Sequence, residues 1–158
     1  MENKSQRKSE NILRLPSWII FPISKASEFE KIQTLIKKSN IHTICEEGRC
    51  PNRAECYASG TATFLLGGSI CSRSCAFCQV SKGKPSAVNT YESIQVAQAV
   101  KTLNLKYVVL TSVARDDLPD HGATLFVSAI SEIRKIDPLI KIEAVSYTHL
   151  TLPTIYSV

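Results

Sequence analysis

The sequence predicts an α/β fold, built as the first half of a parallel (β/α) barrel. Strand-like and helix-like segments alternate from residue 61 onward, and the apolar run at 107–110 is typical of a parallel strand buried on both faces. Strands joined by helical crossovers form a right-handed parallel arrangement. Because three strands make at most half of a closed barrel, we expect further strand–helix units after residue 145.

The composition is that of one ordinary folded domain. The 158 residues are 44% hydrophobic and 21% charged with a formal net charge of +5, which excludes a disordered or collagen-like chain. The apolar run 18–21 is far shorter than the roughly 20 residues that span a bilayer, and no segment has the pattern of a secretory signal. We therefore expect a cytoplasmic protein with reduced thiols and no membrane partner. Its scattered positive charge indicates no nucleic-acid partner.

The N-terminal part of the chain precedes the barrel. Residues 1–11 are polar and predict a disordered tail, whereas two prolines within 13–23 predict an extended, partly buried arm. The stretch 27–30 (Ser-Glu-Phe-Glu) fits a capping box that begins a helix over 28–39. A proline at its start and a glycine after its end predict a short helix over 51–58.

Each barrel element has its own local signal. The strand 61–66 is rich in threonine and apolar residues and ends at two glycines. Asn89 and Glu92 are the expected cap residues of a helix that runs to about residue 103. The buried face of that helix is expected to include Ile94. The remaining elements are expected as a strand at 107–110, a helix at 123–136 and a strand at 139–144.

Six cysteines form two tight triplets. Three thiols that are close in sequence can bind one metal centre without bringing distant parts of the chain together. A 4Fe–4S cluster is usually held by four cysteine thiolates, so three thiolates leave one iron open to another ligand. Arg49 and Arg73 lie inside the triplets, where positive charge favours the thiolate form. The triplets are Cys45-x4-Cys50-x5-Cys56 and Cys71-x3-Cys75-x2-Cys78.

Other roles for these cysteines stay open. Structural zinc also takes thiolates, although such sites are normally four-coordinate and each triplet would leave the ion one ligand short. Free cysteines of the core are a second alternative. A disulfide framework is the third; it suits small secreted proteins, and this chain shows neither feature.

The second triplet resembles the cluster motif of the radical S-adenosylmethionine (SAM) superfamily. That motif is Cys-x3-Cys-x-aromatic-Cys directly after a first barrel strand, here with Phe77 as the aromatic residue. The resemblance implies that Cys71, Cys75 and Cys78 hold a 4Fe–4S cluster whose open iron chelates SAM. It also implies that Phe77 lies close to the adenosine of SAM, with ordinary loop packing as the alternative.

The first triplet narrows the resemblance to lipoyl synthase. Three stretches carry it, within a similarity that covers residues 16–144. They are 45–56 (Cys-Glu-Glu-Gly-Arg-Cys-Pro-Asn-Arg-Ala-Glu-Cys), 60–64 (Gly-Thr-Ala-Thr-Phe) and 111–120 (Thr-Ser-Val-Ala-Arg-Asp-Asp-Leu-Pro-Asp). A lone second triplet would indicate only the superfamily.

The resemblance to lipoyl synthase implies a sulfurtransferase. Radicals from two SAM molecules remove hydrogens from C6 and C8 of an octanoyl group held on a lysine of a carrier domain. The two inserted sulfur atoms come from an auxiliary 4Fe–4S cluster, which the resemblance assigns to Cys45, Cys50 and Cys56. Two 4Fe–4S clusters and SAM are therefore the expected cofactors. The implied partners are an octanoylated lipoyl carrier domain or glycine-cleavage H protein, an electron donor such as flavodoxin or ferredoxin, and an iron–sulfur carrier.

Charged residues follow the second barrel strand, at the end where barrel enzymes place their chemistry. Arg115, Asp116 and Asp117 are the candidate catalytic residues, expected to contact SAM or substrate. The alternative is a solvated loop in which Asp120 helps to start the next helix. His121 stands where the family usually has glycine; histidine tolerates a positive φ better than most residues, so we expect the turn to survive.

Two features depart from the family. Its Arg-Ser-Ser-Tyr-Ser-Arg motif, whose serine is the fourth ligand of the auxiliary cluster, does not occur in this sequence, and residues 146–158 match no part of the family. We therefore expect a C-terminally truncated chain with little activity by itself. The expected domains are a disordered tail (1–11), an arm with the auxiliary-cluster region (12–60), three strands of the radical SAM barrel (61–145) and an aberrant tail (146–158). A non-catalytic iron–sulfur or zinc protein, or another radical SAM enzyme with an auxiliary cluster, are the alternative functions.

Overall fold

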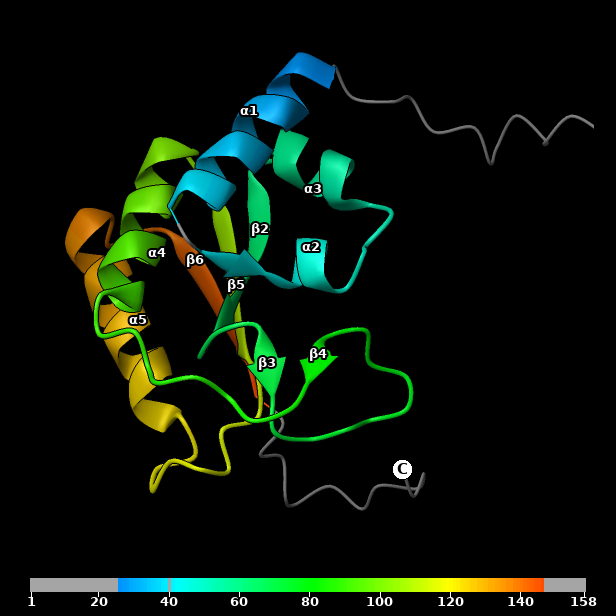
Figure 1. Ribbon diagram of the computed structural model, residues 1–158. Coiled ribbons are helices and arrows are strands. Elements are labelled where there is room, and N and C mark those ends of the chain that lie inside the picture. Colours follow the sequence, from blue (N-terminus) through cyan, green and yellow to red (C-terminus); the bar gives the residue numbers. More distant parts are fainter. Residues whose placement is uncertain (1–25, 40, 147–158) are drawn as a thin grey trace, which may run out of the picture.

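The computed structural model describes residues 26–39 and 41–146 (Figure 1). The expected tail at 1–11, the arm at 13–23 and the segment 147–158 lie outside the described residues, as do the side chains of the capping box. The helices are α1 (Ala26–Lys38), α2 (Ile44–Glu47), α3 (Arg53–Ala58), α4 (Glu92–Thr102) and α5 (Ala123–Ile136). The strands are β1 (His42–Thr43), β2 (Thr61–Leu66), β3 (Ile70–Cys71), β4 (Ser81–Lys82), β5 (Tyr107–Ser112) and β6 (Lys141–Val145).

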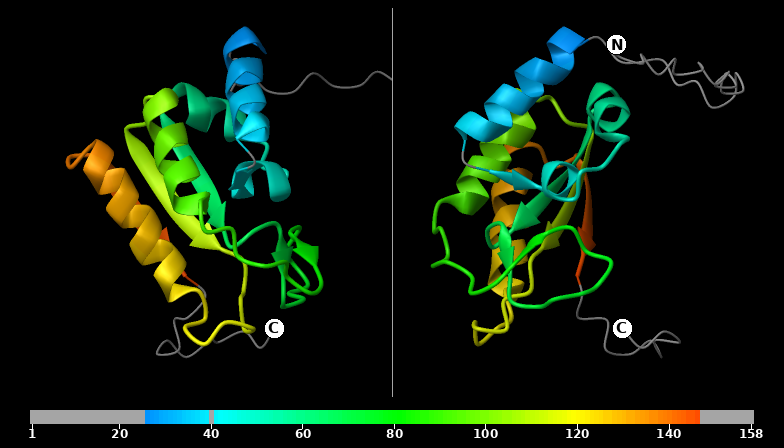
Figure 2. Two further views of the ribbon diagram at one scale, coloured as in Figure 1. Left: turned by 60° about the vertical axis from the view of Figure 1, so that its left-hand side comes forward. Right: turned by 45° about the vertical axis from the view of Figure 1, so that its right-hand side comes forward.

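The strands β2, β5 and β6 form a parallel sheet, and β1 adds an antiparallel edge beside β2. Phe64 pairs with Leu110, and Leu110 pairs with Ala144, so the carboxyl ends of these strands lie at one edge. The helices α4 and α5 connect the strands and cover one face of the sheet (Figure 2). The predicted parallel α/β architecture is confirmed, whereas closure into a barrel stays a prediction.

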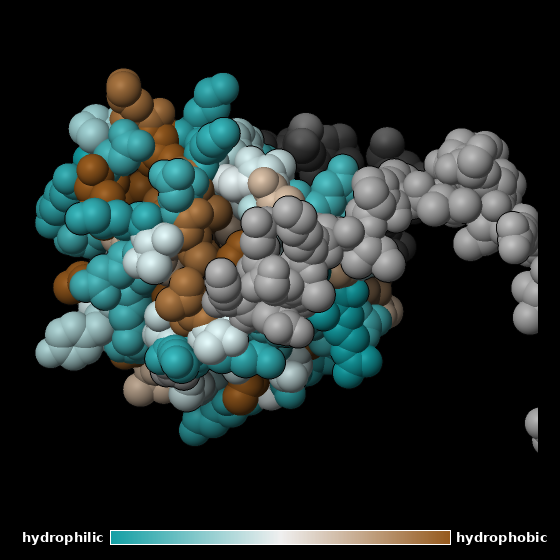
Figure 3. All heavy atoms as spheres, turned by 90° about the horizontal axis from the view of Figure 1, so that it is seen from above, coloured by the Kyte–Doolittle hydropathy of each residue, from teal (hydrophilic) through white to brown (hydrophobic). Residues whose placement is uncertain are grey.

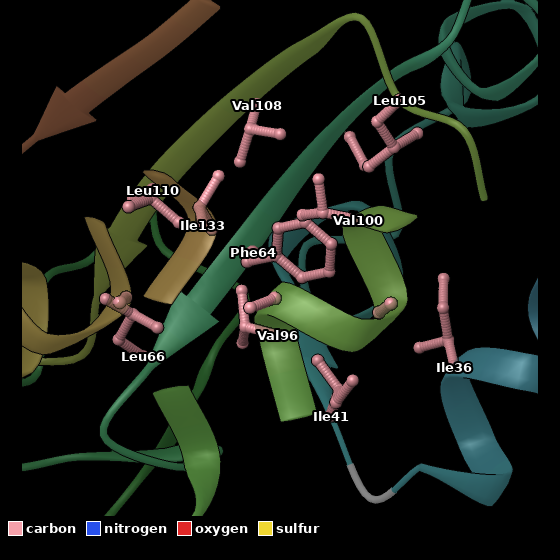
Figure 4. Close-up of a cluster of buried hydrophobic side chains, with 14 of the residues drawn as sticks. Ile36, Ile41, Phe64, Leu66, Val96, Val100, Leu105, Val108, Leu110 and Ile133 are labelled. Atoms are coloured by element: carbon pink, nitrogen blue, oxygen red, sulfur yellow. The ribbon is translucent and has the colours of Figure 1, made fainter. Parts of the chain in front are cut away.

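The core lies between this face of the sheet and the helices α4 and α5 (Figure 4). Phe64 of β2, Val96 of α4 and Ile133 of α5 are each 0% exposed. Full burial of a side chain of this kind contributes about 1.5–3 kcal/mol. Apolar packing of this sort, rather than helix propensity alone, supplies most of the stability of a helix in a protein, and it holds α4 and α5 to the sheet.

The outer surface is mixed in character. Seen from above, hydrophobic residues gather in patches among hydrophilic ones (Figure 3). Leu139 is the most exposed of the large hydrophobic side chains in the described residues, at 89%. In the same part of the chain, none of the helices has the length and apolar character that crossing a membrane requires.

Three expectations about the strands and the buried helix face are wrong. The sequence predicts burial of both faces of the strand at 107–110, but alternate residues are buried, because α4 and α5 cover only one face. Ile94 is 42% exposed, and Val96 is the core residue in its place. The last strand begins at Lys141 instead of 139, because the carboxylate of Asp137 accepts the N–H of Leu139 at 2.9 Å and forms a turn there.

Candidate functional site

A cavity of about 330 Å³ lies at the carboxyl ends of the parallel strands. Its wall includes Leu65 of β2, Ser112 of β5 and Val145 of β6. This is the edge where proteins with parallel sheets place ligands. The second cysteine triplet lines the same cavity, with Cys71, Cys75 and Cys78 all in its wall.

The two ends of the loop that carries the second triplet are paired with each other. Gly67 and Gly68 follow β2 with φ angles of 82° and 96°, which side chains other than glycine rarely adopt, and they turn the chain toward β3. Cys71 ends β3, which pairs with β4, and its carbonyl accepts the N–H of Gly83 at 3.0 Å. The 12 residues from Cys71 to Lys82 therefore form a loop whose two ends are fixed side by side.

Phe77 and Ser112 are the notable non-cysteine residues of the cavity wall. Phe77 is 77% exposed, so most of its surface is open to a ligand. The hydroxyl oxygen of Ser112 is buried and has no hydrogen-bond partner among the described residues. Sequence reasoning missed Ser112; its signal is its place as the last strand residue before the Arg-Asp-Asp stretch.

The first triplet lies on α2, the following loop and α3. Cys45 of α2 is 6% exposed, and its carbonyl accepts the N–H of Cys50 at 3.1 Å. Burial raises the pKa of the Cys56 thiol, and the charges of Cys45 and Cys50 raise it further. The Cys56 thiolate is therefore disfavoured by burial and by the two other cysteines of its triplet, and a bound cationic centre would favour it.

Thr43 and Tyr57 join α2 to α3 behind the first triplet. Thr43 Oγ1 accepts the N–H of Glu46 at 3.3 Å and so caps α2, and it lies 3.4 Å from the hydroxyl of Tyr57 on α3. Both side chains are buried, and burial raises the pKa of Tyr57 above its usual range. The sequence signal for α2, which we did not predict, is a Thr followed three residues later by Glu.

Both triplets fit an iron–sulfur centre by their donor chemistry. All six cysteines are free thiols, and thiolates are the ligands that hold such clusters. Within residues 26–39 and 41–146, no three His, Cys, Asp or Glu side chains are grouped closely enough to hold a single metal ion. A 4Fe–4S cluster makes a looser demand, because its cysteines bind different irons and their sulfurs stand farther apart than the ligands of one ion.

Comparisons with known proteins agree with this pattern. The family model of the N-terminal domain of lipoyl synthase, of the radical SAM family, matches residues 1–50. A lipoyl synthase 2 of Prochlorococcus marinus subsp. pastoris is 83% identical over 146 residues, which cover 92% of this chain and 49% of that protein. The chain is related to the N-terminal portion of lipoyl synthases. The resemblance inferred from the cysteine motifs is thereby confirmed for that portion.

Other lipoyl synthases match over a similar length. A lipoyl synthase 2 of Thermosynechococcus vestitus is 59% identical over 133 residues, or 84% of this chain and 46% of that protein. A lipoyl synthase of Hahella chejuensis is 47% identical over 135 residues, or 85% of this chain and 41% of that protein. The chain thus spans about half the length of the curated relatives it matches. Radical SAM enzymes such as lipoyl synthase generally use SAM and 4Fe–4S clusters.

Arg115 binds the end of β2 and is itself held by Asp117. Arg115 is 2% exposed; its Nη1 donates to the carbonyl of Gly67 at 3.0 Å, and its Nε and Nη2 donate to the carboxylate of Asp117 at 2.9 and 2.8 Å. The buried carboxylate of Glu92, expected as a cap of its own helix, instead accepts the N–H of Gly67 at 3.0 Å. Burial raises the pKa of Glu92. Both polar groups of the Gly67 backbone are therefore bound by ionisable side chains, Glu92 and Arg115.

Asp116 and Asp120 also bind groups of their own chain. Asp116 accepts from Ser72 and Arg73, and these bonds lower its pKa to about 2. Asp120 accepts the N–H groups of Gly122 and Thr124 at 3.1 and 2.8 Å, which lowers its pKa to about 2 and supports the start of α5 as expected. His121 has a φ of 51°, so the turn tolerates histidine as predicted.

Proposed function

We propose that this chain carries the cluster-binding portion of a sulfurtransferase that converts an octanoyl group, attached to a lysine of a lipoyl carrier domain, into a lipoyl group by sulfur insertion at C6 and C8. The observation that carries the proposal is the convergence of Cys71, Cys75 and Cys78 on one cavity at the carboxyl ends of the parallel strands. The similarity to lipoyl synthases supports it.

Each triplet has a proposed cluster. Cys71, Cys75 and Cys78 would hold the 4Fe–4S cluster that binds SAM, and the first triplet would hold the auxiliary cluster. When bound, SAM and the clusters supply the hydrogen-abstracting radical, the electron and the sulfur. Three cysteines per cluster leave an iron open in each, which is the site that SAM or another ligand takes.

The chain's own residues would shape the reaction space. A small apolar cluster lines the cavity and consists of Leu65, Val80 and Val113. It would keep water from a reactive group bound there. The unpaired hydroxyl of Ser112 offers a hydrogen bond to a polar group of a bound ligand. Phe77, exposed at the cavity, would pack against the adenosine of SAM.

The wider assignment follows the family resemblance. We propose an arm and auxiliary-cluster region over 12–60 and barrel strands over 61–145. The proposed partners are an octanoylated carrier domain or glycine-cleavage H protein, an electron donor such as flavodoxin or ferredoxin, and an iron–sulfur carrier. Arg115, Asp116 and Asp117 stay candidates for SAM or substrate contact, although each is bonded to its own chain.

Anaerobic reconstitution with iron and sulfide tests the proposal. The chain should take up about eight irons, as two four-iron clusters require, and it should bind SAM. Replacing all three cysteines of the second triplet by alanine should halve the iron and abolish SAM binding. The matched replacement in the first triplet should halve the iron and leave SAM binding intact. One zinc per triplet with no SAM binding would refute the proposal.

Octanoylated carrier protein then distinguishes lipoyl formation from other radical SAM reactions. A protein of the relatives' full length that carries this N-terminal half should add two sulfur atoms to the carrier, which mass spectrometry detects. The chain as given is expected to add little or no sulfur. SAM cleavage without sulfur on the carrier would indicate a different radical SAM enzyme.

A further inference from the structure

The loop of the second triplet is bonded to the segment that follows β5. Ser72 N–H donates to the carbonyl of Ala114 at 3.2 Å, and the N–H of Ala114 donates back to Cys71 Sγ at 3.3 Å. A cysteine ligand of the proposed cluster therefore receives a backbone hydrogen bond from a residue 43 positions away in the sequence. Hydrogen bonds to cluster sulfurs are among the features that set reduction potentials.

Asp116 binds both residues that follow Cys71. Its Oδ1 accepts from Arg73 Nη2 at 2.7 Å, and its Oδ2 accepts from Arg73 Nε at 3.0 Å, a two-pronged ion pair. Ser72 Oγ lies 2.7 Å from Asp116 Oδ2 and 3.0 Å from the carbonyl of Ala114. The single hydroxyl proton favours the carboxylate, because that contact is shorter and charge-assisted. Both oxygens of Asp116 are thus engaged.

We propose that Asp116 is a positioning residue that, through Ser72 and Arg73, holds Cys71 Sγ on the N–H of Ala114. The group Ser72, Arg73 and Asp116 is called the Asp116 latch below. Without it, the Cys71–Ala114 contact would depend on the weak N–H···S bond and one backbone hydrogen bond. Asp116 is therefore placed to act on the reaction through Ser72 and Arg73, which follow Cys71 in the loop. The effect on a cluster rests on the function proposed above; the effect on the loop does not.

Amide hydrogen exchange in the reduced full chain, measured residue by residue, tests the latch without any metal. In Asp116→Asn the amides of Ser72 and Ala114 should exchange about three- to tenfold faster, the modest range expected for a partly exposed charge-assisted contact. The amide of Cys50, which is bonded to Cys45 in the other triplet, is the internal control and should not change. Glu132→Gln, which removes an exposed ion pair with Lys135, is the matched variant and should change neither site.

Arg73→Gln removes the other half of the ion pair with Asp116 and so tests the same contact independently. If the two residues act through each other, the double variant Arg73→Gln/Asp116→Asn should exchange no faster than the faster single variant. Unchanged exchange at Ala114, or equal acceleration at Cys50, would overturn the proposal, as would additive effects in the double variant.

The reconstituted protein supplies a separate readout. Loss of a hydrogen bond to a ligand sulfur leaves more negative charge on the cluster, so the midpoint potential of the cluster on Cys71, Cys75 and Cys78 should move to more negative values in Asp116→Asn. An unchanged potential in the presence of faster exchange would overturn the effect on the cluster. Failure to bind iron at all would refute the proposed function and leave the exchange result to decide the latch.

Discussion

Replacing Arg115 by methionine is the most direct test of how the ends of β2 and β5 are held together. Arg115 is 2% exposed, and its loss leaves the carbonyl of Gly67 without its partner. An unpaired buried polar group costs about 1–3 kcal/mol. The bonds to Asp117 add less, because that carboxylate is 43% exposed and water solvates it. Methionine fills much of the vacated apolar volume, so the cavity penalty is small.

We therefore expect Arg115→Met to lower the free energy of unfolding by about 2 kcal/mol. Urea unfolding of the purified, reduced chain, followed by far-ultraviolet circular dichroism, measures this change at the transition midpoint. Lys135→Met is the control: the Lys135 side chain is 67% exposed and pairs with Glu132 on the surface, so the loss should stay below about 0.5 kcal/mol. Equal midpoints for Arg115→Met and Lys135→Met would refute the argument that the buried guanidinium supports Gly67.

Three further predictions concern the core, the Gly67 turn and the start of α5. Phe64→Ala should lower the free energy of unfolding by about 3–5 kcal/mol in the same urea assay, because Phe64 is 0% exposed at the centre of the core; a loss below that of Ile94→Ala would contradict it. Glu92→Ala should cost about 1–3 kcal/mol by leaving the N–H of Gly67 unpaired, whereas Glu92→Gln keeps an acceptor there and should cost less at pH 7, since burial raises the pKa of Glu92 and disfavours its charge; equal losses would count against this role. The pKa of Asp120 in the fold is about 2 against an ordinary 3.8, so its carboxylate stabilises the fold above pH 3.8 and that stabilisation disappears as the pH falls toward 2. Unfolding of Asp120→Asn should therefore depend less on pH over this interval, and identical pH profiles would exclude the cap.

Local sequence signals were enough to predict the longer strands and helices of the sheet layer. The strand predicted at 61–66 and the helix predicted at 123–136 have those same bounds in the structure, because strand ends at glycines and helix ends at capped turns depend on neighbours within a few residues. The cysteine spacings are local in the same sense, and they were sufficient to indicate the family. Short elements such as β1, β3 and β4 have two residues each and leave too little pattern to be recognised.

The roles of the charged residues depended on contacts that no local pattern contains. Glu92 and Gly67 are 25 positions apart, Arg115 and Gly67 are 48 apart, and Arg73 and Asp116 are 43 apart. Arg115 and Asp116 reach their partners because β2 and β5 lie side by side with their carboxyl ends at one edge, and Glu92 reaches Gly67 from the start of α4. Such a side chain could contact a ligand, cap a helix or form a structural ion pair. Its role depends on which partner the fold brings within about 3 Å of it, the distance at which hydrogen bonds form. Residue type and spacing therefore predicted the chemistry, and packing of the sheet decided which polar groups are bound within the chain.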